Sequence, residues 1–196
     1  MICSMKKEKI IKNIKEKMVV GVVKLLKLVK AKKLVEGLAD RELNTPEGAG
    51  FDLRLGKVSK VTGKGYMGLQ ERDSANSKII AEYNPSKIKS IIIKPGQSYL
   101  VTTLEKVNMP TNLTAKTWLR STLYRSGIIM SAGNIAPGYS GELSFFFFNA
   151  GKAQMEIDLG ARIVHIVFWK VDGKTNTYRG QWQGGRITSK KKEKQV

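Results

Sequence analysis

Two arginines, Arg120 and Arg125, are the side chains of this 196-residue chain best suited to bind phosphate. Ser121 and Thr122 follow the first arginine directly. A guanidinium group donates two parallel hydrogen bonds to a phosphate, and neighbouring hydroxyl groups add further donors. The segment from Arg120 to Arg125 therefore predicts a cradle for a phosphate chain.

A glycine-rich segment with the pattern of a hairpin follows at Ala132–Gly141, AGNIAPGYSG. Its three glycines and one proline permit a tight turn and let backbone groups come close to a flat ligand. The next residues, Leu143–Phe148, are too apolar for a solvated strand and too few for an ordinary helix. We therefore expect a base-binding hairpin that leads into a buried core strand.

These segments, taken in order, resemble the deoxyuridine triphosphatase and deoxycytidine triphosphate deaminase superfamily. The resemblance rests on RSxLxRxG at Arg120–Gly127, on xPGYxGEL at 136–143 and on Asn149 at the end of the following strand. Four further segments agree with the superfamily's motif order, so that the resemblance covers residues 34–186; they are Gly50–Gly56, Thr103–Glu105, Gly160–Phe168 and Tyr178–Gly184.

The resemblance implies a role for each part of the candidate site. Arg120, Ser121 and Gln183 are assigned to the triphosphate, and Arg125 matches an arginine that shapes the site near the reacting centre. Charge neutralisation along the phosphate chain is the physical role of these groups.

The hairpin and the C-terminal segment would hold the nucleoside. By resemblance, the backbone of Gly133, Asn134 and Ile135 reads the pyrimidine, and Tyr139 packs beneath the sugar and disfavours a ribose 2′-hydroxyl. A glycine-rich closing segment is expected to act as a lid over the bound nucleotide. The lid residues are Tyr178, Arg179 and Trp182.

Two carboxylates that the resemblance leads us to expect are absent. The family's triphosphatases have an aspartate at the position of Ala136, where it orients and deprotonates the attacking water. The deaminases have a glutamate in the following strand, at the position of Phe146. The chain is then an altered or inactive relative, or an engineered variant at Ala136, or a protein in which Glu142 or Asp52 takes over.

The single histidine, His165, stands where the family usually has a glutamine that reaches the phosphates. Strand alternation puts Ile163 and His165 on the face opposite Arg162 and Val164, so we expect an imidazole bonded to backbone in the core or at a subunit interface. The sequence shows no direct metal site. Mg²⁺ is expected to arrive bound to the triphosphate.

Short strands separated by glycine and proline must position these residues. Phe51–Leu55 alternates apolar and charged residues, and the stretch Gln70–Lys78 is predicted to be an exposed loop. Seven more strands are predicted at Ile79–Tyr83, Ile88–Ile93, Tyr99–Thr103, Thr114–Leu119, Leu143–Phe148, Met155–Ile157 and Ala161–Val171. This pattern indicates an all-β fold, which in the superfamily is a distorted jelly-roll or β-barrel.

The N-terminal region has a helical pattern instead. Met5–Lys17 carries one apolar stripe and is predicted to be an amphipathic helix. Met18–Val23 is predicted to be a strand from its β-branched residues, and the following leucines and lysines could continue as helix. We divide the chain into a basic helical extension (1–40), a nucleotide-binding domain (41–185) and a basic tail (186–196).

The net charge of +19 is spread over all three parts, with +7 on residues 1–40 and +4 on residues 186–196. A basic domain attracts a polyanionic nucleotide. The lysine runs at the ends lack interleaved aromatic residues, so they suit solubility or weak, nonspecific contact with nucleic acid. Lysines interrupt the apolar runs well before the ~20 residues that a bilayer requires, and one cysteine, Cys3, fits a reducing compartment. We expect a cytoplasmic protein.

We therefore predict a dUTP diphosphatase-like protein that hydrolyses dUTP to dUMP and pyrophosphate. The resemblance also implies a homotrimer whose sites are shared between subunits. The first alternative is a catalytically silent protein that binds a deoxypyrimidine nucleoside triphosphate. A dCTP deaminase, which would need the glutamate that Phe146 replaces, is ranked behind it.

Overall fold

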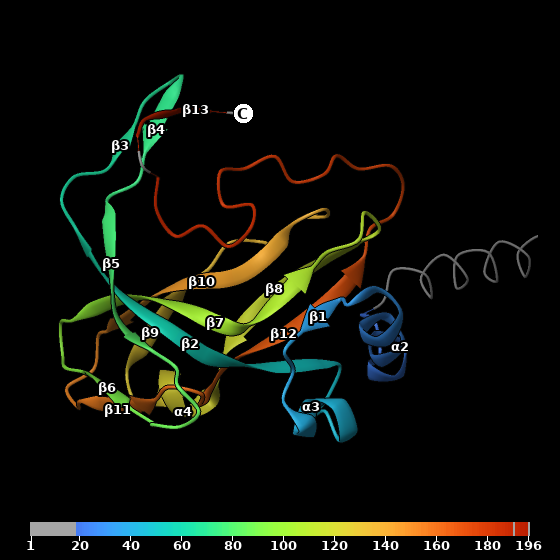
Figure 1. Ribbon diagram of the computed structural model, residues 1–196, viewed down its shortest axis with the longest axis horizontal. Coiled ribbons are helices and arrows are strands. Elements are labelled where there is room, and N and C mark those ends of the chain that lie inside the picture. Colours follow the sequence, from blue (N-terminus) through green and yellow to red (C-terminus); the bar gives the residue numbers. More distant parts are fainter. Residues whose placement is uncertain (1–18, 190, 196) are drawn as a thin grey trace, which may run out of the picture.

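The computed structural model describes residues 19–189 and 191–195, and its main feature is an antiparallel sheet that curls into a nearly closed barrel (Figure 1). Strand β1 (Val35–Glu36) pairs with β7, and β5 (Asn76–Glu82) pairs with β2. The other strands follow the order β8 (Leu113–Leu119), β12 (Arg162–Lys170), β2 (Gly50–Thr62), β7 (Ser98–Asn108), β10 (Ser140–Asn149) and β9 (Ile128–Ser131). The predicted all-β fold is confirmed.

Side chains that alternate along the strands fill the barrel. In β10, Leu143, Phe145 and Phe147 are buried in the core, while Glu142 and Ser144 lie on the other face. Phe146 also lies on this other face and is 42% exposed. The expectation of a wholly buried phenylalanine run is therefore wrong for Phe146, because successive side chains of a strand point to opposite faces.

Two small sheets extend the barrel. Strand β6 (Ser90–Ile93) pairs with β11 (Met155–Asp158), and β3 (Tyr66–Met67), β4 (Glu71–Asp73) and β13 (Glu193–Lys194) form a three-stranded sheet. The latter projects from the barrel beyond β2 and β5, at the upper left of Figure 1. The predicted loop at Gln70–Lys78 is wrong, because β4 and the beginning of β5 occupy this stretch.

Two helices within residues 19–44 lie against the barrel. Helix α2 spans Val22–Lys32, and the short α3 spans Asp40–Asn44. The strand predicted at Met18–Val23 is wrong from Val22 onward, where α2 begins; only Val19 forms an isolated bridge, with Trp169. The leucine and lysine pattern of α2 prevails over local β propensity because Leu25 is fully buried.

The division of the chain at residue 40 stays a prediction. Leu34 and Val35 are buried, and β1 is hydrogen-bonded to β7, so described residues on both sides of this boundary contact the same barrel. The predicted helix Met5–Lys17 and Cys3 lie outside the described residues. Within the described part of the chain, no helix is both long and apolar enough to cross a membrane.

Candidate nucleotide-binding site

A cavity of ≈ 310 Å³ lies between the hairpin that precedes β10 and the C-terminal segment. Its lining includes all four residues predicted to hold the nucleoside, namely Gly133, Asn134, Ile135 and Tyr139. Ala136 and Glu142 line the same cavity. The fold therefore brings the predicted base-binding residues together with one carboxylate.

Backbone hydrogen bonds fix the hairpin to the beginning of β8 and the end of β7. Ile135 is buried and exchanges backbone hydrogen bonds of 2.9 and 3.1 Å with Ala115. Met109 donates from its backbone N–H to Tyr139 (2.8 Å) and accepts from Gly138 (3.0 Å). Gly138 has a φ of +79°, and a Cβ there would lie 2.7 Å from Thr177. Only glycine allows the C-terminal segment to approach this turn so closely.

Tyr139 is buried at the base of this cavity. Its hydroxyl group donates to the carbonyl oxygen of Glu142 at 2.6 Å, and its ring meets Tyr178 edge-on with 5.3 Å between centroids. Burial, together with the nearby Tyr178 and Glu142, raises the pKa of Tyr139 to about 12. The side chain is therefore a neutral, fixed surface for a ligand at physiological pH.

The C-terminal segment lies over the hairpin of the same chain and forms the other wall of the cavity. The backbone N–H of Tyr178 donates to Pro137 (2.7 Å), and that of Gly184 donates to Ser140 (2.7 Å). The amide of Gln183 donates to the carbonyl oxygen of Gly138 (3.1 Å) and accepts from the backbone N–H of Ser140 (3.2 Å).

The predicted lid residues are distributed over this segment. Tyr178 and Trp182 line the cavity, whereas Arg179 is exposed and does not line it. Gln183, predicted to bind phosphate, is bonded to the hairpin backbone instead. The structure thus shows the segment closed over the cavity within one chain.

Glu142 is the one carboxylate among the described residues that line the cavity. Nζ of Lys57 lies 2.9 and 3.2 Å from its two carboxylate oxygens. Phe146, at the position of the deaminase glutamate, does not line the cavity. A proton-transferring group for a bound base is therefore available in this chain at residue 142, not at residues 136 or 146.

The predicted phosphate-binding residues lie at the other end of β8. Ile135 pairs with Ala115 near the beginning of this strand, whereas Arg120 follows its last residue and precedes helix α4 (Ser121–Arg125). Five extended residues span about 17 Å. Ser121 and Arg125 are exposed on α4. Within one chain, the structure does not bring this motif to the hairpin.

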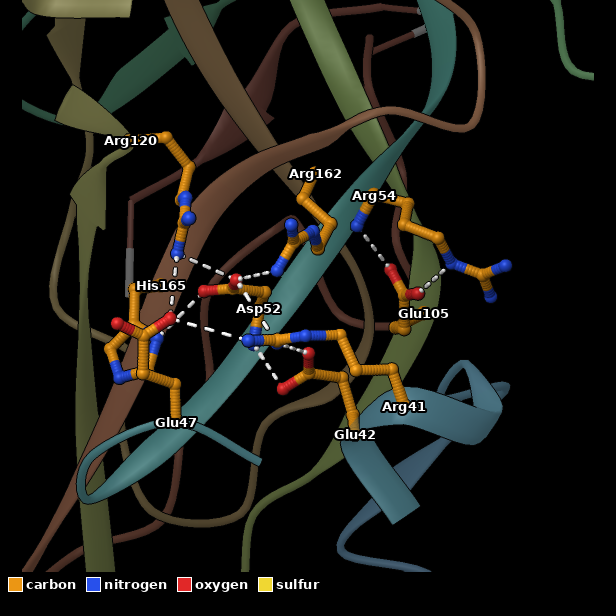
Figure 2. A network of polar contacts seen from close by, with 9 residues as sticks. All are labelled: Arg41, Glu42, Glu47, Asp52, Arg54, Glu105, Arg120, Arg162 and His165. Carbon is orange, nitrogen blue, oxygen red and sulfur yellow. Dashed lines mark hydrogen bonds and ion pairs between the residues drawn. The ribbon is translucent and has the colours of Figure 1, made fainter. Parts of the chain in front are cut away.

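Arg120 belongs instead to a network around the buried carboxylate of Asp52 (Figure 2). Nη1 of Arg120 and Nη1 of Arg162 both donate to Oδ2 of Asp52, at 2.6 and 2.9 Å. Oδ1 is hydrogen-bonded to Nδ1 of His165 at 2.8 Å. Burial alone would raise the pKa of Asp52, but the His165 hydrogen bond and the Arg120 charge outweigh it and hold this pKa below its usual value.

The prediction that His165 is bonded to backbone is wrong, because its partner is the Asp52 carboxylate. His165 and Asp52 are directly paired across β12 and β2, and the register shifts between Arg162 and Val164. Such a bulge breaks the alternation of side chains. Arg162 and His165 therefore reach the same carboxylate, although a regular strand would put them on opposite faces.

Acidic and basic groups of neighbouring elements complete the network in Figure 2. Glu42 accepts from the backbone N–H of Asp52 (2.9 Å) and is paired with Arg41. Glu47, which is exposed, lies 3.9 Å from Arg120. Arg120 and Arg162 thus share one buried carboxylate between them. Their guanidinium groups are partly exposed and retain positive charge for an anion.

A third buried carboxylate, Glu105, besides Asp52 and Glu42, fixes β2 to β7 beside this network. It accepts from the backbone N–H and from Nε of Arg54, at 2.7 and 2.6 Å. Burial raises the pKa of Glu105, while the bonds from Arg54 act in the opposite direction.

Arg162 and Arg186 are two residues that the sequence analysis did not assign to the site. Arg162 borders the same surface pocket as Arg120 and Thr122. Arg186 lines the hairpin cavity. The motif containing Arg162 was visible in the sequence, but its contact with Asp52 depends on the bulge.

The barrel has the fold of the dUTPase and dCTP deaminase superfamily. Residues 20–171 match the sequence profile of the family described as DCD: dCTP deaminase-like. The chain belongs to this family.

Proteins of similar sequence agree with this assignment. The chain is 33% identical over 162 residues to the dCTP deaminase of Thermococcus kodakarensis, covering 82% of this chain and 92% of the relative. It is 35% identical over 141 residues to the "dCTP deaminase, dUMP-forming" of Sulfurihydrogenibium sp., covering 70% and 77%. The crystal structure of 2′-deoxycytidine 5′-triphosphate deaminase from Agrobacterium tumefaciens has the same fold, with a TM-score of 0.61 and 17% identity over 80% of this chain and 49% of that one.

Proposed function

We propose that this protein binds dCTP and removes the amino group of its base by hydrolysis, giving dUTP and ammonia. The proposal rests on one observation: the base-binding hairpin and the carboxylate of Glu142 line the same cavity. The names of the relatives support dCTP as the substrate. The dUTP diphosphatase reaction, our first prediction from the sequence, has less support than deamination.

In this reaction the base lies against the backbone of Gly133–Ile135 and the sugar lies on Tyr139. Tyr178 and Trp182 exclude bulk water from the other side, which strengthens polar interactions inside the cavity. Glu142, which is paired with Lys57, takes a proton from a water molecule as it attacks the amino-bearing carbon. The attack opens the double bond between this carbon and the neighbouring ring nitrogen, and that nitrogen takes up a proton. The carboxyl group of Glu142 then gives its proton to the amino group, the carbon–nitrogen bond to that group breaks and ammonia leaves. The attached hydroxyl group loses its remaining proton and becomes the carbonyl oxygen, so that the two protons of the water end on ammonia and on the ring nitrogen.

The triphosphate needs a second copy of the chain. Since Arg120 lies about 17 Å along β8 from the hairpin contact, we propose a homotrimer in which this motif of one subunit faces the cavity of its neighbour. Ser121 and Arg125 would accompany Arg120. The described residues include no cluster of three or more His, Cys, Asp or Glu side chains able to hold a metal ion. We propose that Mg²⁺ enters bound to the triphosphate, as it usually does.

A catalytically silent nucleotide-binding protein is the second candidate. It is favoured by the apolar side chains of Ala136 and Phe146 at the two positions where the family has carboxylates. This candidate predicts tight binding of dCTP without any turnover.

Product analysis separates these functions. The protein is incubated with dCTP or dUTP and Mg²⁺, ammonia and pyrophosphate are measured, and the nucleotides are resolved by anion exchange. Ammonia and dUTP from dCTP support deamination, and Glu142→Gln is the matched control that keeps the shape of the side chain. Pyrophosphate without ammonia would overturn deamination in favour of the triphosphatase. Calorimetry that detects dCTP binding without products supports the silent protein, and absent binding contradicts both candidates.

A mixing experiment tests the shared site. Arg120→Ala removes the guanidinium group that binds phosphate in one half of the site. Glu142→Gln removes the carboxylate in the other half. Subunit exchange between the two inactive variants creates some sites with both native residues, so activity should return. Mixtures that stay inactive although mass photometry shows mixed trimers would contradict sharing, and a monomer in sedimentation would contradict the trimer.

A further inference from the structure

The three-stranded sheet at the upper left of Figure 1 contains the C-terminal tail as one of its strands. We define the arm as residues 59–80 together with the described residues of 186–195. In it, β13 pairs with β4, and the buried Ser189 bonds to Asp73 (2.7 Å) and three times to Ser74 (2.9 Å each). The basic tail is thereby held in place as part of a built surface.

Two lysines in the arm face each other without an acidic partner. Lys60 of β2 and Lys78 of β5 are directly opposite in the antiparallel ladder, and both are exposed. No carboxylate among the described residues forms an ion pair with either of them. Like charges placed directly opposite destabilise a pair of strands. A bound anion would offset this repulsion.

The rest of the arm is also basic. Its described residues include eight lysines and arginines but only three acidic residues, and Arg186 already pairs with one of these, Glu193. Among the described residues, lysines without an acidic partner continue along the chain from Lys60 through Lys64 toward β3. The chain from Lys60 to Tyr66 spans at most about 20 Å. This length is greater than the size of one phosphate group and is long enough to contact several successive phosphates of a nucleic-acid strand.

The arm also supplies the aromatic group that the lysine run lacks in the sequence. Tyr66 is 49% exposed, and Nζ of Lys192 lies 4.6 Å from its ring centroid. Met67 and Leu69 are exposed beside it. Cations interleaved with an aromatic ring are the combination that binds unpaired nucleotides, because phosphates are neutralised while a base stacks on the ring.

We propose that the arm binds single-stranded nucleic acid. Lys60, Lys78 and the tail lysines contact successive phosphates, and Tyr66 with its apolar neighbours contacts an unstacked base. A duplex would present phosphates to the lysines but no free base to Tyr66. Lys60, Lys78 and Tyr66 do not line the hairpin cavity, although Arg186 and Ile187 at the start of the tail do. The proposal does not depend on the proposed deaminase activity.

Fluorescence anisotropy with a labelled single-stranded oligonucleotide tests the site at several salt concentrations. The full-length chain is used throughout, so that its N-terminal lysines are present in every variant. Each phosphate contact contributes about −0.7 to the slope of log K against log salt for single strands. Lys60→Ala/Lys78→Ala should therefore make the slope shallower by about 1.4 and weaken binding roughly 25-fold at 0.1 M salt.

Lys87→Ala/Lys89→Ala is the matched control, because it removes two exposed lysines from the loop between β5 and β6, outside the arm. This control should change the affinity less than the arm variant does. Tyr66→Ala should weaken binding about ten-fold at every salt concentration without changing the slope. Circular dichroism establishes that each variant is folded.

Three outcomes would overturn the proposal. The first is a salt slope that the arm variant leaves unchanged, or that the control changes equally. The second is that the protein binds a duplex of the same length with equal affinity and that Tyr66→Ala has no effect. This result would show that the arm contacts the phosphate backbone but no base. The third is preferential, lysine-dependent binding to phosphatidylserine vesicles, which assigns it to an anionic membrane surface.

Discussion

His165 and Asp52 are direct cross-strand partners whose side chains are hydrogen-bonded, with 2.8 Å between Nδ1 and Oδ1. This bond uses one carboxylate oxygen and leaves the other for Arg120 and Arg162. Asp52 is fully buried, whereas the two guanidinium groups are partly exposed. Asp52 therefore orients the arginines toward the surface, and we regard it as a positioning residue for the proposed phosphate site.

Asp52→Asn should destabilise the fold. The change leaves two guanidinium groups facing a neutral amide, and removal of one partner from a buried ion pair costs about 3–5 kcal/mol. Because the arginines reach solvent, we expect a smaller loss of about 1–3 kcal/mol in the free energy of unfolding. Urea denaturation measures it. Asp158→Asn, at an exposed carboxylate, is the control and should stay within about 0.5 kcal/mol of the unchanged protein.

The Asp52 contribution should also depend on pH. The pKa of Asp52 is lower in the folded protein than the value of about 3.9 expected for the unfolded chain. Its stabilising effect is therefore fully present above that unfolded value and is lost as the pH falls through the folded value. The difference in unfolding free energy between the unchanged protein and Asp52→Asn should be constant from about pH 7 to 5 and shrink below about pH 4. A difference that grew on acidification would contradict this reading of the network.

The fold was predictable from the sequence because its signals are local. The alternating residues of Phe51–Leu55 predict the strand that they form, and the glycines at 133–141 predict the hairpin that they form. The Asp52 network was not predictable, because one bulge in β12 decides which side chains reach the carboxylate. The place of Gln183 depends likewise on a contact between segments far apart in the chain, which no local pattern encodes.

Tyr139 should remain protonated in alkaline solution. Its pKa is raised to about 12, first by burial and then by Tyr178 and Glu142. The absorbance change at alkaline pH should therefore be the same in Tyr139→Phe and in the unchanged protein up to about pH 11. Spectrophotometric titration of both proteins measures this. A tyrosine that titrates near its ordinary pKa in the unchanged protein but not in Tyr139→Phe would show that the hydroxyl group is not buried.

Lys78→Glu should stabilise the protein while it weakens the proposed binding by the arm. The new carboxylate would stand directly opposite Lys60, and an opposite-charge pair at such a position contributes about 0.2–1 kcal/mol. We expect a higher unfolding free energy by this amount and weaker oligonucleotide binding. Lys87→Glu makes the same charge change outside the strand ladder and should produce neither effect. Loss of stability in Lys78→Glu would show that the two lysines do not repel each other.

Ala136→Asp tests whether the missing aspartate limits the second reaction of the superfamily. Ala136 lines the cavity and is not fully buried, so a carboxylate can be placed there with a stability change of about 0.5 kcal/mol or less. General-base catalysis contributes about 10²–10⁴-fold, and we expect pyrophosphate release from dUTP to rise by a factor in this range. Ammonia release from dCTP, which we assign to Glu142, should stay near its original rate. Ala136→Asn has nearly the same size without the charge and should not gain this activity. If Ala136→Asp binds dUTP as tightly as the unchanged protein but releases no pyrophosphate, the site has diverged beyond residue 136, and the silent nucleotide-binding candidate gains.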